Sequence, residues 1–234
     1  AVASVTTSEI RGLSVWNSEG FSADNALYII GSSDVLISDP RIKNWDGEPI
    51  VFSGCNRIRV QGGEILDTSG NSCGIENSSN ITIDGVKFRS FDISTVFKSR
   101  TANTQSTGVS LLNLEIAAGG TSDPILGFYN GAVDNLVIQG CVISGAVTGA
   151  ASFGNLFLRS LSTDWFICKD NTFLLRESSS GLASGAFYFR IPNTEKSEFV
   201  NNTFLNETAS AVISVTEFGD VTMEPDKLLY YHGV

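Results

Sequence analysis

Three of the aspartates in the first half of the chain lie at intervals of 21 and 25 residues, and two of these three directly follow an aromatic residue. Asp46 follows Trp45 and Asp92 follows Phe91, while Asp67 lies between the two pairs. Two carboxylates can supply the acid and the base or nucleophile of glycoside hydrolysis, and an aromatic ring offers a flat apolar face to a sugar. The pattern predicts a sugar-cleaving groove with Asp46, Asp67 and Asp92 as catalytic candidates and Trp45 and Phe91 as stacking residues.

Two basic residues belong to the same candidate groove. Lys43 and Arg89 each stand two residues before one of the aromatic residues. A cation can bind a sugar carboxylate or stabilise negative charge that develops in a transition state, so both are predicted to bind substrate. A structural interpretation stays open, because turn residues are often Asp and because Trp45 can pack beneath a loop.

An internal repeat indicates which elements would position these residues. Segments with apolar residues at their first, third and eighth positions begin at Val35, Ile58 and Ile81, each 23 residues after the last. The series continues at intervals of 27 to 31 residues with segments that begin at Val109, Leu136, Phe166 and Ser197, of which the one at Ser197 is weaker. A last segment is expected to begin at Val221. Alternating apolar residues, then a turn and another inward residue, indicate a strand, a bend and a second strand.

The repeat predicts a solenoid of stacked β-coils rather than a propeller, a leucine-rich repeat or a sandwich. Residues that tolerate a left-handed backbone stand at the expected bends, namely Gly62, Gly85, Asn113, Gly140, Asp170 and Asn202. Further apolar stretches, such as Ile50 to Phe52, close each turn. The expected fold is all-β, with about eight or nine coils of roughly 23–31 residues. It forms one domain, 1–234, with a first coil and cap at 1–34, regular coils at 35–218, and a cap or subunit contact at 219–234.

The stacking distance between coils gives an estimate for the candidate carboxylates. Coils lie about 4.8 Å apart, so Asp46 and Asp92, two coils apart, would be separated by about 9–10 Å. Inverting glycosidases hold their carboxyl groups about 6.5–9.5 Å apart and retaining ones about 5–5.5 Å. The Asp46/Asp92 pair therefore suits inversion, and Asp67 with Asp92 suits either mechanism.

A second charged column has a structural interpretation. Its members occupy the seventh position of four successive repeats and alternate in sign: Arg41, Glu64, Lys87 and Glu115. Opposite charges that face each other on neighbouring strands contribute about 0.2–1 kcal/mol per pair. We expect a ladder on one outer face, with Glu64 and Glu115 as reserve acid–base candidates.

Composition argues against several classes of function. The formal net charge of −10 repels phosphate backbones, so no nucleic-acid partner is expected. The single histidine, His232, stands near the chain end, which disfavours a central catalytic histidine or a His-rich metal site. The four cysteines form no CxxC pair and are predicted to be free and buried. No D-x-D cluster indicates a calcium site, and neither a metal nor a cofactor is expected. No membrane insertion is expected, since no run of about 18 apolar residues occurs.

The repeat resembles the right-handed parallel β-helix of the pectate-lyase-like superfamily. The coil ITIDGVKF and the endings DNTF and NNTF are similar to those of phage tailspike and polysaccharide-depolymerase β-helices, and the resemblance covers Val35 to about Asp220. It implies a polysaccharide as substrate or receptor, a homotrimer, and a place on the virion tail or outside the cell. The family's early GDG-type segment is missing here.

Two hypotheses about function follow. In the first, the chain is a tailspike-like protein that binds and depolymerises a bacterial surface polysaccharide as a glycosidase or lyase. In the second, it is a receptor-binding or structural β-helix of a larger fibre, without catalysis. The aromatic–aspartate pairs favour the first hypothesis, and the featureless row Ala117 to Gly120 favours the second.

Overall fold

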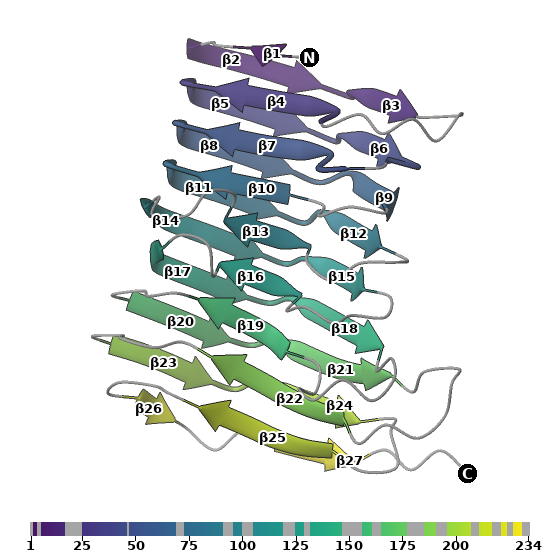
Figure 1. The fold of residues 1–234 in the computed structure, drawn as a ribbon, viewed down its shortest axis with the longest axis vertical. Coiled ribbons are helices and arrows are strands. Elements are labelled where there is room, and N and C mark those ends of the chain that lie inside the picture. The colour runs from purple at the N-terminus through teal and green to yellow at the C-terminus, as the bar shows by residue number, and fades with distance from the viewer. Residues whose placement is uncertain are drawn as a thin grey trace.

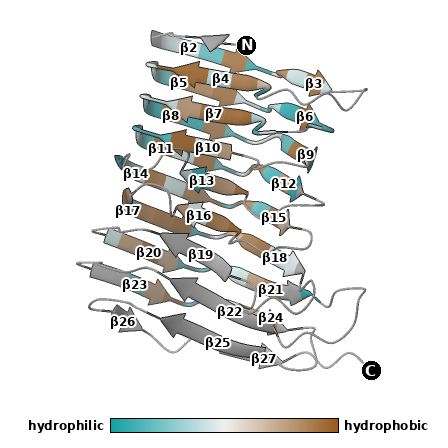
Figure 2. Ribbon diagram, in the orientation of Figure 1, coloured by the Kyte–Doolittle hydropathy of each residue, from teal (hydrophilic) through white to brown (hydrophobic). Residues whose placement is uncertain are grey.

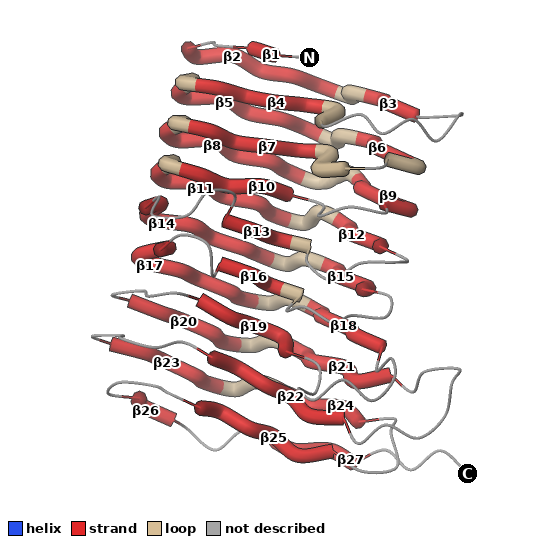
Figure 3. The backbone as a smooth tube through the Cα atoms, viewed as in Figure 1, coloured by secondary structure: helices blue, strands red, loops and turns tan. Residues whose placement is uncertain are grey.

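The apolar columns of the sequence line the inside of a parallel β-helix. The structure, a computed structural model, describes residues 2–3, 6–16, 25–45, 47–68, 73–90, 96–99, 105–118, 125–128, 132–146, 156–160, 165–176, 185–190, 196–206, 211–216, 221–223 and 227–230. Within these residues every regular element is a strand. The strands form three sheets along the molecule, and neighbouring strands in each sheet are parallel (Figure 1, Figure 3). The all-β parallel β-helix predicted from the sequence is confirmed.

Each sheet contains nine of the described strands, and its successive members come from successive coils. Sheet A contains β1 (Val2–Ala3), β4 (Leu27–Ile30), β7 (Ile50–Ser53), β10 (Cys73–Glu76), β13 (Phe97–Ser99), β16 (Leu126–Phe128), β19 (Leu156–Ser160), β22 (Gly185–Arg190) and β25 (Ala211–Thr216). Sheet B contains β2 (Thr6–Arg11), β5 (Ser33–Ser38), β8 (Asn56–Gln61), β11 (Ser79–Asp84), β14 (Gln105–Leu112), β17 (Ala132–Gln139), β20 (Trp165–Lys169), β23 (Lys196–Val200) and β26 (Val221–Met223). Sheet C contains β3 (Ser14–Trp16), β6 (Arg41–Lys43), β9 (Glu64–Thr68), β12 (Lys87–Ser90), β15 (Glu115–Ala118), β18 (Val142–Ala146), β21 (Thr172–Arg176), β24 (Thr203–Asn206) and β27 (Lys227–Tyr230).

Equivalent positions of successive repeat segments pair with each other in the sheets. Val35 pairs with Ile58, and the first positions of the later segments stay in register across sheet B as far as Val221. The eighth positions pair in the same way across sheet C, from Ile42 to Phe204. Because a slip of one residue would turn a whole apolar column outward, burial of the interior specifies this register.

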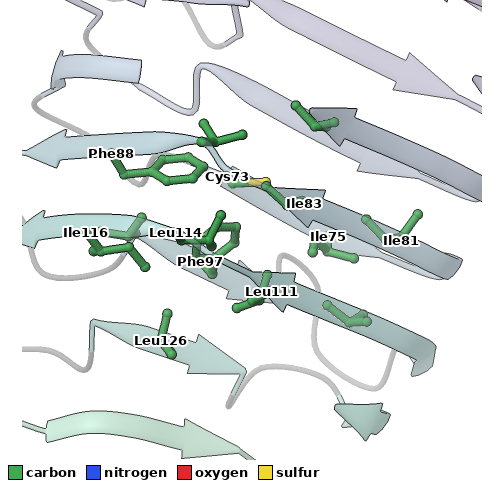
Figure 4. Close-up of a cluster of buried hydrophobic side chains, with 14 of the residues drawn as sticks. Cys73, Ile75, Ile81, Ile83, Phe88, Phe97, Leu111, Leu114, Ile116 and Leu126 are labelled. Carbon is green, nitrogen blue, oxygen red and sulfur yellow. The ribbon is translucent and has the colours of Figure 1, made fainter. Parts of the chain in front are cut away.

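Side chains from all three sheets meet in one continuous hydrophobic interior. Ile81, Phe88 and Phe97 come from sheets B, C and A and are all buried (Figure 4). Farther along the helix the rings of Phe173 and Phe204, on neighbouring coils, stack with their centroids 5.3 Å apart. Such ring pairs contribute about 0.5–1.5 kcal/mol beyond the area that they bury. The interior therefore joins each coil to its neighbours.

Each described passage from sheet B to sheet C takes two residues, and the first of them has a left-handed backbone. Asn113 and Asp170 have φ values of 52° and 57° at this place. Asn202 was predicted at the bend near the end of the chain, and this prediction was wrong by one residue. The left-handed residue is Asn201, with a φ of 53°, while Asn202 is buried. Both asparagines tolerate a left-handed backbone, so residue type does not show which of them lies at the bend. What decides it is the pairing of Phe204 with Phe173 on the previous coil.

Two asparagines occupy interior places that hold apolar residues in earlier coils. The Asn171 side chain accepts a hydrogen bond from the Cys141 backbone N (2.9 Å) and donates to the Ile138 carbonyl (2.9 Å). Nδ2 of Asn171 also donates to Oδ1 of Asn202 (3.0 Å), and Nδ2 of Asn202 donates to the Cys168 carbonyl (2.9 Å). These amides satisfy backbone groups that the bends would otherwise leave buried without a partner.

Candidate functional site

A β-bulge near the end of β9 shapes the candidate site. In the pairing of β9 with β12, Leu66 faces Arg89 and Thr68 faces Ser90, so Asp67 is an extra residue between them. Its φ of 56° marks the left-handed backbone of the bulge. A bulge redirects a side chain while the ladder on either side continues, and Thr68 accordingly returns to the buried side.

The bulge brings Asp67 between two cations from the coils on either side. Arg89 donates from Nε (3.2 Å) and Nη2 (2.9 Å) to Oδ1 of Asp67, while Nζ of Lys43 lies 3.5 Å from Oδ2. The Asp67 side chain is only 14% exposed, whereas those of Lys43 and Arg89 are 54% and 48% exposed. We call Lys43, Asp67 and Arg89 the sheet C network; it joins three successive coils through β6, β9 and β12 (Figure 1).

The other predicted site residues fall into two groups. Trp45 is half-buried and packs against the hydrophobic interior, with its indole Nε1 buried, which is the packing role that the sequence left open. Asp46, Phe91 and Asp92 lie outside the described residues. The predicted distance between the Asp46 and Asp92 carboxylates is therefore not tested. The structure therefore brings together Lys43, Asp67 and Arg89 of the seven predicted residues.

An exposed tryptophan that was not among the predicted site residues lies beside this network. Trp16, on β3, pairs in register with Lys43 and is 70% exposed. It precedes the first segment recognised in the repeat, which began at Val35. A signal was nevertheless present, since Ile10 and Val15 fall in register with the third and eighth positions of the next coil. Extending the columns by one coil would have placed Trp16 in line with Lys43.

Ion pairs between neighbouring coils also occur elsewhere on the outer surface. The predicted ladder is in register from Arg41 to Glu115, and its last two members form an ion pair of 3.0 Å between Lys87 Nζ and Glu115 Oε2. On sheet B, Arg59 Nη2 lies 3.1 Å from Oδ2 of Asp84.

The hydropathy of sheet C changes along the molecule. Figure 2 shows that β6 is largely hydrophilic and β18 largely hydrophobic.

The cysteines are poorly placed to act as nucleophiles. Cys55, Cys73, Cys141 and Cys168 are all free and buried, which confirms the prediction. Burial raises the pKa of the Cys141 thiol to about 11, and burial together with the Glu48 carboxylate raises the pKa of Cys73. Since the thiolate is the reactive form, the raised pKa values of Cys73 and Cys141 add to the protection that burial gives all four thiols.

We expect that none of the four thiols reacts with Ellman's reagent at pH 8 in the folded protein. All four should react once guanidinium chloride unfolds it. The absorbance of the released thionitrobenzoate, followed with and without denaturant, measures both numbers. Rapid release of one equivalent from the folded protein would contradict the burial described above.

The described residues contain neither a metal-binding cluster nor a membrane-spanning helix. No group of three His, Cys, Asp or Glu side chains in these segments is placed to hold a metal ion. None of the described segments is a helix with the length and hydrophobicity to cross a membrane. His232 lies outside the described residues.

Comparisons with protein-family models, curated proteins and solved structures found no match for this chain. The fold is that of a parallel β-helix, with an ion-paired cluster on β6, β9 and β12 of sheet C and an exposed tryptophan on the neighbouring strand β3.

Proposed function

We propose that this protein binds a long polysaccharide on the outward face of sheet C. The observation that carries the proposal is the alignment of Lys43, Asp67 and Arg89 on three successive coils. A polysaccharide repeats along its length as a solenoid repeats along its axis, so equivalent groups on successive coils can contact successive sugars. Cationic N–H donors and a carboxylate acceptor are suitable partners for sugar hydroxyls.

Binding, rather than cleavage, is the function that the described side chains support best. Oδ1 of Asp67 contacts Arg89 and Oδ2 contacts Lys43. A role for Asp67 as general acid or base would require these contacts to break, because proton transfer needs a group within hydrogen-bond reach of the substrate. Cleavage would then depend on Asp46 and Asp92, which stay candidates from the sequence.

The parallel β-helix also supports a proposal about where this protein acts and what it recognises. Together with the DNTF and NNTF endings, it supports a tailspike-like receptor-binding protein of the pectate-lyase-like type. Such a protein would recognise a bacterial surface polysaccharide, act on a virion tail or outside the cell, and assemble as a homotrimer. This setting rests on the resemblance in fold, whereas the binding face rests on named residues.

The test is binding to a panel of bacterial capsule and O-antigen polysaccharides, followed by affinity electrophoresis. We expect retardation by at least one member of the panel. Arg89→Ala should weaken that binding about tenfold or more, because a hydrogen bond to a charged group contributes about 1.5–3 kcal/mol. Arg59→Ala is the matched control: Arg59 is about equally exposed (52%) and also pairs with a carboxylate, but on sheet B.

Two results would contradict the proposal: no retardation by any polysaccharide of the panel, or an equal loss from Arg59→Ala and Arg89→Ala. The same incubations separate binding from cleavage. Reducing ends without absorbance at 235 nm would indicate hydrolysis, and absorbance at 235 nm would indicate a lyase. Activity of either kind that disappears in Asp46→Asn or Asp92→Asn would assign the chemistry to those residues.

A further inference from the structure

We propose that Trp16 is the surface on which one sugar ring of the bound polysaccharide stacks. This inference rests on the binding function proposed above and adds a contact that the sheet C network lacks. The network offers charged and polar groups, whereas a sugar ring also has an apolar face of C–H groups. An aromatic ring is the side chain that matches such a face.

The pairing of the strands places Trp16 in the same outward column as the two cations. Trp16 pairs with Lys43, Lys43 with Leu66, and Leu66 with Arg89. With strands about 4.8 Å apart, the column runs about 14 Å from Trp16 to Arg89 along the axis of the helix. This span exceeds a single sugar ring, so one chain can contact the indole and the cations together.

Hydrogen-bond donors next to the indole complete a sugar-binding arrangement. The ammonium group of Lys43 carries three donors, and its 3.5 Å contact with Oδ2 of Asp67 occupies at most one of them. The remaining N–H groups can donate to hydroxyls at the edge of a ring that lies on Trp16. Stacking sets the plane of the sugar, and the donors select its hydroxyl pattern.

The other two tryptophans differ from Trp16 in ways that make the assignment specific. Trp45 packs against the hydrophobic interior and is half-buried. Trp165 is 47% exposed, but it lies on β20 of sheet B, away from the column. A large apolar side chain that is 70% exposed, as Trp16 is, is unusual for a residue that serves packing alone.

The test measures affinity for the capsule or O-antigen polysaccharide that retards the unmodified protein most strongly. We expect Trp16→Ala to weaken this binding about tenfold. Trp16→Phe keeps a ring and should lose no more than about threefold, and Trp165→Ala should bind as the unmodified protein does. Fluorescence gives a second measurement: saturating polysaccharide should change the tryptophan emission of the unmodified protein but not that of Trp16→Phe.

The possible outcomes separate this inference from the function on which it rests. If Arg89→Ala weakens binding while Trp16→Ala binds normally, stacking on Trp16 is wrong and the binding face stands. If Trp16→Phe loses as much affinity as Trp16→Ala, the ring is not the contact and the inference is again overturned. If no polysaccharide retards the unmodified protein, the proposed function fails and the inference with it.

Discussion

Replacing Gly63 with alanine is expected to destabilise the fold by about 3 kcal/mol or more. Gly63 has a φ of 83°, and an added Cβ would lie 2.6 Å from both N and Cδ of Pro40 and closer still to the Pro40 carbonyl oxygen. That oxygen accepts a hydrogen bond from the Glu64 backbone N (2.7 Å), which continues the ladder across the bend. The left-handed backbone costs an alanine about 1–2 kcal/mol, and the steric overlap adds about 1–3 kcal/mol.

The matched control for this prediction is Gly85→Ala, one coil farther on. Gly85 has a φ of 65°, but the nearest atom to an added Cβ is the Gly62 backbone N at 3.9 Å. Gly85→Ala should therefore cost only the backbone term of about 1–2 kcal/mol. Midpoints of urea unfolding, followed by circular dichroism, give both values. Equal midpoints for the two variants would show that the close approach of Pro40 does not limit this position.

Replacing Asn171 with aspartate should have an effect of similar size, because it puts a carboxylate into the interior. The amide Nδ2 donates to the Ile138 carbonyl and to the side-chain oxygen of Asn202. A carboxylate of the same shape would face both oxygens without a donor, and no cation is among the hydrogen-bond partners that the described residues provide here. We expect a loss of about 3 kcal/mol or more in the free energy of unfolding, measured from denaturant midpoints.

Two further variants isolate the cause of this loss. Asn171→Leu should lose less, about 1–3 kcal/mol, because Leu114 occupies the equivalent interior place two coils earlier and only the hydrogen bonds disappear. Asn77→Asp makes the same chemical change at an exposed left-handed position and should stay within about 0.5 kcal/mol. A variant Asn171→Asp as stable as Asn77→Asp would rule out the buried amide network.

Most of the architecture follows from local patterns in the sequence. Apolar residues at the first, third and eighth positions, such as Val35, Ile37 and Ile42, are sufficient to predict strands, bends and register. The error at Asn202 arose where two neighbouring residues both tolerate the left-handed backbone. The polar interior of Asn171 and Asn202 was not predicted, since a polar residue in an inward column looks like a turn residue until its partners are known.

The candidate site was predictable only in part. The columns placed Lys43 and Arg89 in line and Asp67 in the next column, and all three were predicted in one groove. The bulge that brings Asp67 between the cations was not predicted, because it depends on an extra residue in β9 relative to β12. Of the two tryptophans near the network, Trp45 attracted attention because it precedes an aspartate, yet it packs against the interior. Trp16, outside the recognised segments, is the exposed one.

The sequence by itself determined the all-β fold, the coil register and most of the bends of this protein. The alternation of apolar residues in a strand and the steric limits on a left-handed backbone both act over a few residues. Both can therefore be recognised in the sequence directly. Only the tertiary structure decided which side chains are partners. Arg89 contacts Asp67 from 22 residues away, and Asn202 contacts Cys168 from 34. Such contacts depend on the length of every coil between the partners and on which atoms a neighbouring coil presents, and no local pattern contains that information.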